Sequence, residues 1–123
     1  MRLDGEQGNP LEPRRPRRYT QGLRGPQAVA ETQAHQRREV HYQGTVQGVG
    51  FRYTVRRIAG RFAVDGYVRN LPDGRVLLVA EGPPQELDRF LEAVHTTMGR
   101  CIDDVHETVS QATGQLQQFE IRY

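Results

Sequence analysis

The sequence has few of the residue types on which several classes of protein depend. Cys101 is the only cysteine in 123 residues, which excludes an internal disulfide framework and any pair of cysteine metal ligands. No apolar run approaches the roughly 18 residues that a membrane-spanning helix needs, and residues 1–30 lack the apolar core of a signal peptide. We therefore expect a soluble, cytoplasmic protein without membrane association.

The histidines also lack the spacing of a metal site. His41, His95 and His106 show no i, i+4 or other metal-ligand grouping. We expect them to be structural or exposed, and we expect no bound metal.

Apolar residues make up only 36% of the chain, a low share that a disordered portion would explain. Residues 1–37 contain four of the seven prolines, four glycines and five glutamines, with little apolar periodicity. We predict that they form a disordered tail. An alternative is that they are not translated, because the start codon is misassigned.

The charge differs between this tail and the rest of the chain. Residues 1–37 hold seven arginines and four acidic residues (net +3), whereas residues 38–123 hold ten and eleven (net −1). The arginines between residues 14 and 18 could contact nucleic acid, but a short basic patch in a tail is more often simply solvated. We do not expect specific nucleic-acid binding.

Residues 38–123 show the apolar patterns of a single domain. From Phe51 apolar residues recur at offsets of 4, 7, 8 and 11, and from Leu87 at offsets of 3, 4, 7 and 11, which is typical of helices with one buried face. In other segments apolar and polar residues alternate, or most residues are apolar, and both patterns are typical of strands. The expected elements are a strand at 40–46, a helix from 51 to 62, strands at 64–70 and 75–81, a helix from about 84 to 98, and strands at 102–109 and 119–123.

This order of elements predicts an α+β fold. Strand-helix-strand-strand-helix-strand, joined by right-handed crossovers, gives an antiparallel sheet with both helices on one face, which is the ferredoxin-like sandwich. The last short strand is an addition to that pattern. The fold alone does not identify the function, because many unrelated activities use it.

The sequence GTVQGVGFR, residues 44–52, joins the first strand to the first helix. Its three glycines permit backbone angles at which successive N–H groups point toward one anion. A helix that begins at the same place adds its unpaired N–H groups and its positive dipole end. Arg52 follows in the first turn, where its guanidinium can bind two phosphate oxygens. We interpret this segment as a phosphate-binding loop.

A second segment, GYVRNLPDG at residues 66–74, ends in a tight turn between two strands. Together the two segments closely resemble the two signature motifs of the acylphosphatase family, in the family's order and with roughly its spacing. The resemblance extends over about residues 38–123. A difference is Ala63, which stands where relatives often carry a glycine after the first helix.

The resemblance implies hydrolysis of acyl phosphates to a carboxylate and inorganic phosphate, without metal or cofactor. It implies that Arg52 binds the phosphoryl group and that Asn70 orients the attacking water. The small-molecule acyl phosphate is the expected partner, and we expect a monomer. The backbone amides that the resemblance assigns to phosphate binding are those of Val46, Gln47, Gly48, Val49, Gly50 and Phe51.

Two other interpretations stay open at this point. The domain could bind phosphate without turnover, as a regulatory module, or it could bind RNA, since RNA recognition motifs share the topology. RNA recognition needs stacking aromatics on the central strands, and the strand at residues 75–81 has none. A phosphate-release assay distinguishes the three functions.

Overall fold

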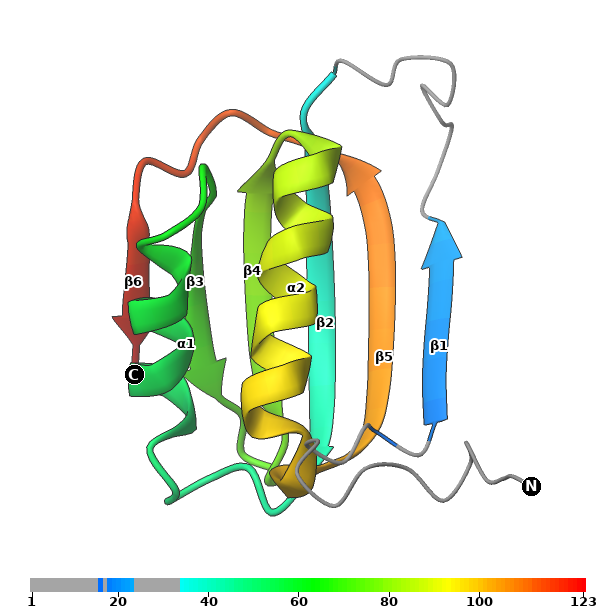
Figure 1. Cartoon of the computed structure of the whole chain (residues 1–123), viewed down its shortest axis with the longest axis vertical. Helices are drawn as coiled ribbons and strands as arrows, with labels where there is room; N and C mark the ends of the chain where they lie inside the picture. Colours follow the sequence, from blue (N-terminus) through cyan, green and yellow to red (C-terminus); the bar gives the residue numbers. More distant parts are fainter. Residues whose placement is uncertain (1–15, 17, 24–33) are drawn as a thin grey trace, which may run out of the picture.

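The computed structural model describes Pro16 and residues 18–23 and 34–123. These residues form one six-stranded sheet, and both α-helices lie on the same face of it (Figure 1). The elements are β1 (Arg18–Leu23), β2 (Gln36–Gly44), α1 (Phe51–Ala59), β3 (Asp65–Asn70), β4 (Val76–Gly82), α2 (Pro84–Met98), the 3₁₀ helix η2 (Gly99–Cys101), β5 (Ile102–Gln111) and β6 (Phe119–Arg122). The predicted ferredoxin-like α+β architecture is confirmed.

The sheet is mixed, so the prediction of a strictly antiparallel sheet is wrong at both edges. Its order is β1-β5-β2-β4-β3-β6. The four central strands pair antiparallel, whereas β1 pairs parallel with β5 and β6 pairs parallel with β3. The chain leaves β5 at one end of the sheet and crosses that end before it enters β6 (Figure 1). Because β6 therefore runs opposite to β5, as β3 does, β6 and β3 run in the same direction.

Strand β1 lies inside the segment 1–37 for which we predicted disorder, so that prediction is wrong for residues 18–23. It is also wrong at the end of the segment, because β2 already begins at Gln36. The remainder of the predicted tail up to residue 33, except Pro16, lies outside the described residues. β1 extends the sheet beyond β5 in a register that places Arg18 opposite Asp104. The Arg18 guanidinium donates two hydrogen bonds to the Asp104 carboxylate, at 2.8 and 2.9 Å.

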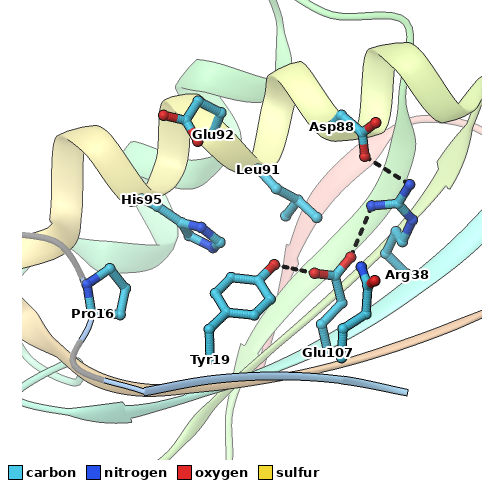
Figure 2. A pocket seen from close by; sticks show the side chains of 9 residues that line it. Pro16, Tyr19, Arg38, Asp88, Leu91, Glu92, His95 and Glu107 are labelled. Atoms are coloured by element: carbon cyan, nitrogen blue, oxygen red, sulfur yellow. Dashed lines mark hydrogen bonds and ion pairs between the residues drawn. The ribbon is translucent and has the colours of Figure 1, made fainter. Parts of the chain in front are cut away.

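A buried carboxylate also joins β1 to the rest of the domain (Figure 2). The Tyr19 hydroxyl donates a hydrogen bond to Glu107 of β5, whose side chain is 1% exposed. The guanidinium of Arg38 donates to the same carboxylate at 2.8 Å and to Asp88 of α2 at 2.9 Å. A buried carboxylate is stable only when it is paired and hydrogen-bonded. Tyr19 therefore supplies one of the hydrogen bonds that satisfy this buried carboxylate.

The core lies between the sheet and the two helices, and the apolar stripes of the sequence supply it. Helix α1 buries Phe51, Val55, Ile58 and Ala59, and α2 buries Leu87, Phe90, Leu91, Val94, His95 and Met98. His95 is structural, as expected, because its Nε2 hydrogen-bonds the buried Tyr42 hydroxyl at 2.9 Å. Among the helices of the described residues, none combines the length and apolar character needed to cross a bilayer.

Helix α1 is shorter than the apolar spacing predicted. It ends at Ala59, and the next residues form a turn in which the Arg61 and Phe62 N–H groups donate to Ile58 and Ala59. Phe62 still packs against the core from this turn. Ala63 causes no backbone strain here, because no non-glycine residue of the described chain has a positive φ. Its N–H donates to the Glu86 carboxylate at 2.8 Å.

Candidate active site

The glycine loop, defined here as residues 44–50, leads from β2 to α1 and contains three glycines with a positive φ, the first of which is Gly44 at 141°. Gly48 has a φ of 79° and Gly50 a φ of 74°, angles that side chains with a Cβ resist. Gly50 is also the N-cap of α1, and its carbonyl oxygen accepts the first helical hydrogen bond from the Thr54 N–H at 3.0 Å. These glycines let the helix begin immediately at Phe51.

The N-terminus of α1 has no anionic partner within the part of the chain that the structure describes. No side chain caps it, and its first turn contains no acidic residue. The first N–H groups of a helix lack intrahelical acceptors and carry partial positive charge. This end of the helix can therefore bind an anion, and phosphate is a typical one.

Arg52, in the first turn of α1, is oriented by the C-terminal segment. Its Cζ lies 4.9 Å from the centre of the Tyr123 ring, and its Nη1 lies 3.5 Å from the Arg122 carbonyl oxygen. A guanidinium that stacks on a ring through its face keeps the N–H donors along its edge for oxygen ligands. The end of β6 therefore helps to set the direction in which Arg52 presents these donors.

Asn70 is the last residue of β3, immediately before the tight turn to β4. The Leu71 N–H donates to the Arg75 carbonyl at 2.8 Å, and the Gly74 N–H donates to the Leu71 carbonyl at 3.1 Å. The Asp73 carboxylate accepts from the Arg75 N–H at 3.1 Å and from its guanidinium at 2.8 Å, which holds the pKa of Asp73 below its usual value. Asn70 therefore precedes a turn whose conformation is stabilised by several hydrogen bonds.

The glycine loop, α1, β3 and the C-terminal strand meet around a pocket of about 230 Å³. Both side chains that the sequence singled out, Arg52 and Asn70, line it. Of the six predicted loop residues, four line the pocket, whereas Gln47 and Val49 do not. The lining consists of Val46, Gly48, Gly50, Phe51, Arg52, Tyr53, Asn70, Ile121 and Tyr123. The arrangement can hold an anion between backbone amides and a guanidinium, beside a side-chain amide.

Gln47, which we predicted to lie at the phosphate-binding site, does not line the pocket. Its side-chain Nε2 donates to the carbonyl oxygens of Leu71 and Arg75, at 2.8 and 3.0 Å. These two carbonyls belong to the turn that follows Asn70. Gln47 therefore ties the glycine loop to the hairpin that carries Asn70, and so fixes the two halves of the pocket relative to each other.

Sequence reasoning missed three residues that line the pocket, Tyr53, Ile121 and Tyr123. Tyr53 follows Arg52 directly, and its position on the outer face of α1 was the only available signal. Ile121 and Tyr123 reach the pocket because β6 pairs with β3. No pattern within residues 119–123 indicates that partner.

Larger pockets lie elsewhere on the described residues. One of about 550 Å³ lies beneath α2 and includes Tyr19, Arg38, His95 and Glu107, which are occupied by the contacts described above (Figure 2). Another, of about 560 Å³, lies at the end of β2 around Gly44 and Asp73. Neither contains Arg52 or Asn70. Across the described residues, no three His, Cys, Asp or Glu side chains lie close enough together to hold a metal ion.

Comparisons with known proteins point to one family. A family model described as Acylphosphatase matches residues 38–121. An acylphosphatase of Archaeoglobus fulgidus is 55% identical over 56 residues, a match that covers 46% of this chain and 63% of that protein, less than two thirds of its length. An acylphosphatase of Salinibacter ruber is 41% identical over 93 residues, which cover 75% of this chain and 98% of that protein.

The solved structures show the same likeness. The crystal structure of acylphosphatase from Bacillus subtilis has a TM-score of 0.64 to this chain at 35% sequence identity. The superposition covers 72% of this chain and 99% of that one.

Proposed function

Since this chain belongs to the acylphosphatase family and hydrolyses acyl phosphates, we propose that Arg52, Asn70 and the amides of the glycine loop carry out that reaction. The observation that supports this most strongly is the single pocket lined by both side chains at the N-terminus of α1. In this proposal the phosphoryl group lies between the loop amides and the Arg52 guanidinium. Asn70 holds a water molecule on the side opposite the leaving group.

The reaction requires the protein mainly to position the reactants and to stabilise negative charge on the phosphoryl group. The water oxygen attacks phosphorus, the bond from phosphorus to the acyl oxygen breaks, and the acyl group leaves as a carboxylate. Because carboxylic acids have pKa values of about 4–5, no side chain has to protonate this leaving group near neutral pH. The proton of the water passes to a phosphate oxygen, so the products are a carboxylate and dihydrogen phosphate.

The proposed residues supply the two contributions that phosphoryl transfer needs. The transition state is loose, with negative charge spread over the equatorial oxygens, so it is stabilised by positioned donors. The amides and the guanidinium provide these donors. The Asn70 amide can both donate and accept a hydrogen bond, which allows it to orient water. These steps use no metal and no cofactor.

The proposal is tested with Arg52→Ala and Asn70→Ala. Each should lower the turnover of benzoyl phosphate by about 10²–10³, the usual loss for one stabilising group. The measurement is steady-state phosphate release with EDTA present. Arg57→Ala is the matched control, because Arg57 is exposed on the same helix and does not line the pocket. Wild-type turnover by folded Asn70→Ala contradicts the role of Asn70, and a requirement for added metal contradicts the mechanism.

We also propose that the working unit is a monomer with residues 38–123 as its catalytic domain. The family model matches residues 38–121, and eight of the nine residues that line the pocket lie in that range. Binding of inorganic phosphate without any phosphate release from benzoyl phosphate would instead support a regulatory module.

A further inference from the structure

Two histidines that are far apart in the sequence lie opposite each other in the sheet. His41 of β2 is the register partner of His106 of β5, and the register of these two antiparallel strands is regular as far as Gln43. Residues directly opposite each other in an antiparallel pair have Cβ atoms about 4.5–5.5 Å apart. The sequence spacing of the histidines indicates no metal site, but the sheet places two imidazoles next to each other.

Both histidines project from the face of the sheet that neither α-helix covers (Figure 1). On the helix side Val40, Tyr42 and Val105 belong to the buried core. Because successive side chains of a strand point to opposite faces, His41 and His106 point away from that core. His41 is half-buried and His106 is exposed, so an ion from solution can reach the pair.

Two neighbouring imidazoles can bind one transition-metal ion. Histidine is the commonest protein ligand of such ions, and imidazole suits Zn²⁺, Cu²⁺ and Ni²⁺. Metal–nitrogen bonds of about 2.0–2.1 Å place two ligating nitrogens roughly 3–3.5 Å apart. Two cross-strand side chains can reach this separation by rotation about their χ angles. The pairing of β2 and β5 therefore fits a chelate to which each strand supplies one ligand.

The surroundings of His41 favour the neutral imidazole, which is the form that binds metal. Burial lowers the pKa of His41, and the charges of Arg75 and His106 lower it further. Glu39 and Asp73 act in the opposite direction but do not cancel the decrease. A proton therefore competes little with a metal ion for His41 at neutral pH.

Two carboxylates of the same face are already paired with arginines. Glu39 accepts a hydrogen bond from the Arg37 guanidinium at 2.9 Å, and Asp104 accepts one from Arg18 at 2.8 Å. The described residues hold no group of three potential metal ligands, so water would complete the coordination of an ion on the histidines. Mg²⁺ and Ca²⁺ require mostly oxygen ligands. The ligand set therefore selects transition metals over these two ions.

We infer that His41 and His106 form a two-histidine site for one divalent transition-metal ion on the face of the sheet opposite the helices. The site is separate from the pocket with Arg52 and Asn70, since neither histidine lines that pocket. An ion bound here links β2 to β5 and stabilises the folded chain, because the unfolded chain does not hold the two imidazoles together. Affinity should be highest for Cu²⁺ among Cu²⁺, Ni²⁺ and Zn²⁺.

The test titrates the full chain, freed of metal by dialysis against EDTA and then against buffer, with Zn²⁺, Cu²⁺, Ni²⁺ and Mg²⁺ in a calorimeter. We expect one transition-metal ion per chain and no binding of Mg²⁺. His41→Asn and His106→Asn should each weaken Zn²⁺ binding at least about tenfold, because the loss of one of two linked ligands removes the chelate. Electron paramagnetic resonance of the Cu²⁺ complex should show two coupled nitrogens, and one in either variant.

The matched control is His35→Asn, because His35 is exposed and precedes β2 without a histidine partner in the described register. It should leave the affinity for Zn²⁺ unchanged. His106 is exposed, so His106→Asn tests the site even if His41→Asn does not fold. Absence of Zn²⁺ binding, unchanged affinity in folded His106→Asn, or Mg²⁺ binding as tight as that of Zn²⁺ overturns the inference. None of these measurements depends on turnover of acyl phosphates.

Discussion

Arg52 and Asn70 come from different parts of the sequence, and residues outside both motifs contact the Arg52 guanidinium. Tyr123 and the Arg122 carbonyl lie against the Arg52 guanidinium. A long, flexible side chain that is already oriented loses less entropy when it binds a ligand. The C-terminal residues therefore contribute to the order of the site even though they belong to neither motif.

At the residue scale, the first prediction concerns Gln47. Gln47→Met has a similar length but removes both hydrogen bonds from Nε2 to the turn after Asn70. The loop and the hairpin should then move independently, and a small displacement of a positioned group has a large kinetic effect. We expect kcat for benzoyl phosphate to fall about tenfold, while the affinity for inorganic phosphate changes by about twofold or less, because the loop amides and Arg52 are retained.

The two readouts separate positioning from general structural damage. Steady-state kinetics give kcat, and competitive inhibition by inorganic phosphate gives its affinity. Gln43→Met is the control, since Gln43 is exposed at the end of β2 and does not line the site. Equal losses of kcat and phosphate affinity in Gln47→Met would mean that the loop itself had collapsed.

At the scale of elements, the connection from β5 to β6 decides whether the C-terminal residues reach the site. Glu81 of β4, 5% exposed, holds this connection. Its carboxylate accepts from the Thr113 N–H at 3.0 Å, the Gly114 N–H at 3.1 Å and the Arg37 guanidinium at 2.9 Å. Burial works against ionisation of Glu81, but these donors outweigh it and lower its pKa.

This lowered pKa predicts how stability depends on pH. A carboxyl group whose pKa is lower in the folded than in the unfolded state stabilises the fold above its unfolded pKa, here about 4.5, and loses that contribution as the pH falls through the folded pKa. The free energy of unfolding of wild-type protein should therefore decrease from pH 6 to pH 3. Glu81→Gln should lose about 1–2 kcal/mol at pH 6 and much less at pH 3.

Urea unfolding at pH 6, 4.5 and 3 measures this dependence. Glu120→Gln is the control, because Glu120 is about half exposed in an ion pair with Arg122, and such pairs contribute about 0–1 kcal/mol. If Glu81→Gln is destabilised equally at all three values, the carboxylate charge is not the cause of the effect.

At the scale of the whole molecule, β1 lies outside the region that the family model matches, residues 38–121. It nevertheless forms the outermost strand of the sheet beside β5 and supplies the Tyr19 hydroxyl to the buried Glu107. The pocket with Arg52 and Asn70 is at the other end of the sheet order, next to β3 and β6. β1 should therefore affect stability more than catalysis.

Removal of residues 1–33, so that the chain starts at Ala34, tests this separation. We expect turnover of benzoyl phosphate within about twofold of the full chain. We expect the free energy of unfolding to fall by about 1–3 kcal/mol, because a buried carboxylate loses a hydrogen bond and β5 becomes an edge strand. Urea unfolding and steady-state kinetics at one temperature give both values. Loss of turnover in a folded, shortened chain would contradict the prediction that β1 affects stability more than catalysis.

Much of the fold could be predicted because its signals are local. The apolar spacing from Phe51 and Leu87 follows the period of a helix, and Pro72, Asp73 and Gly74 suit a tight turn whatever surrounds them. Where local signals end, the predictions were wrong: α1 stops at Ala59, and residues 18–23 form a strand. The strand depends on pairing with β5, and nothing within those six residues reveals that partner.

The sequence by itself determined the order of the elements from β2 onward and the glycine loop, because backbone preferences and apolar periods are properties of neighbouring residues. The two side chains of the motifs came from the resemblance to the family. Only the tertiary structure decided the directions of the two edge strands, the approach of Tyr123 to Arg52 and the bonds from Gln47 to the hairpin. Those contacts join residues that are at least 24 positions apart. Their free energy depends on the packing of the entire sheet.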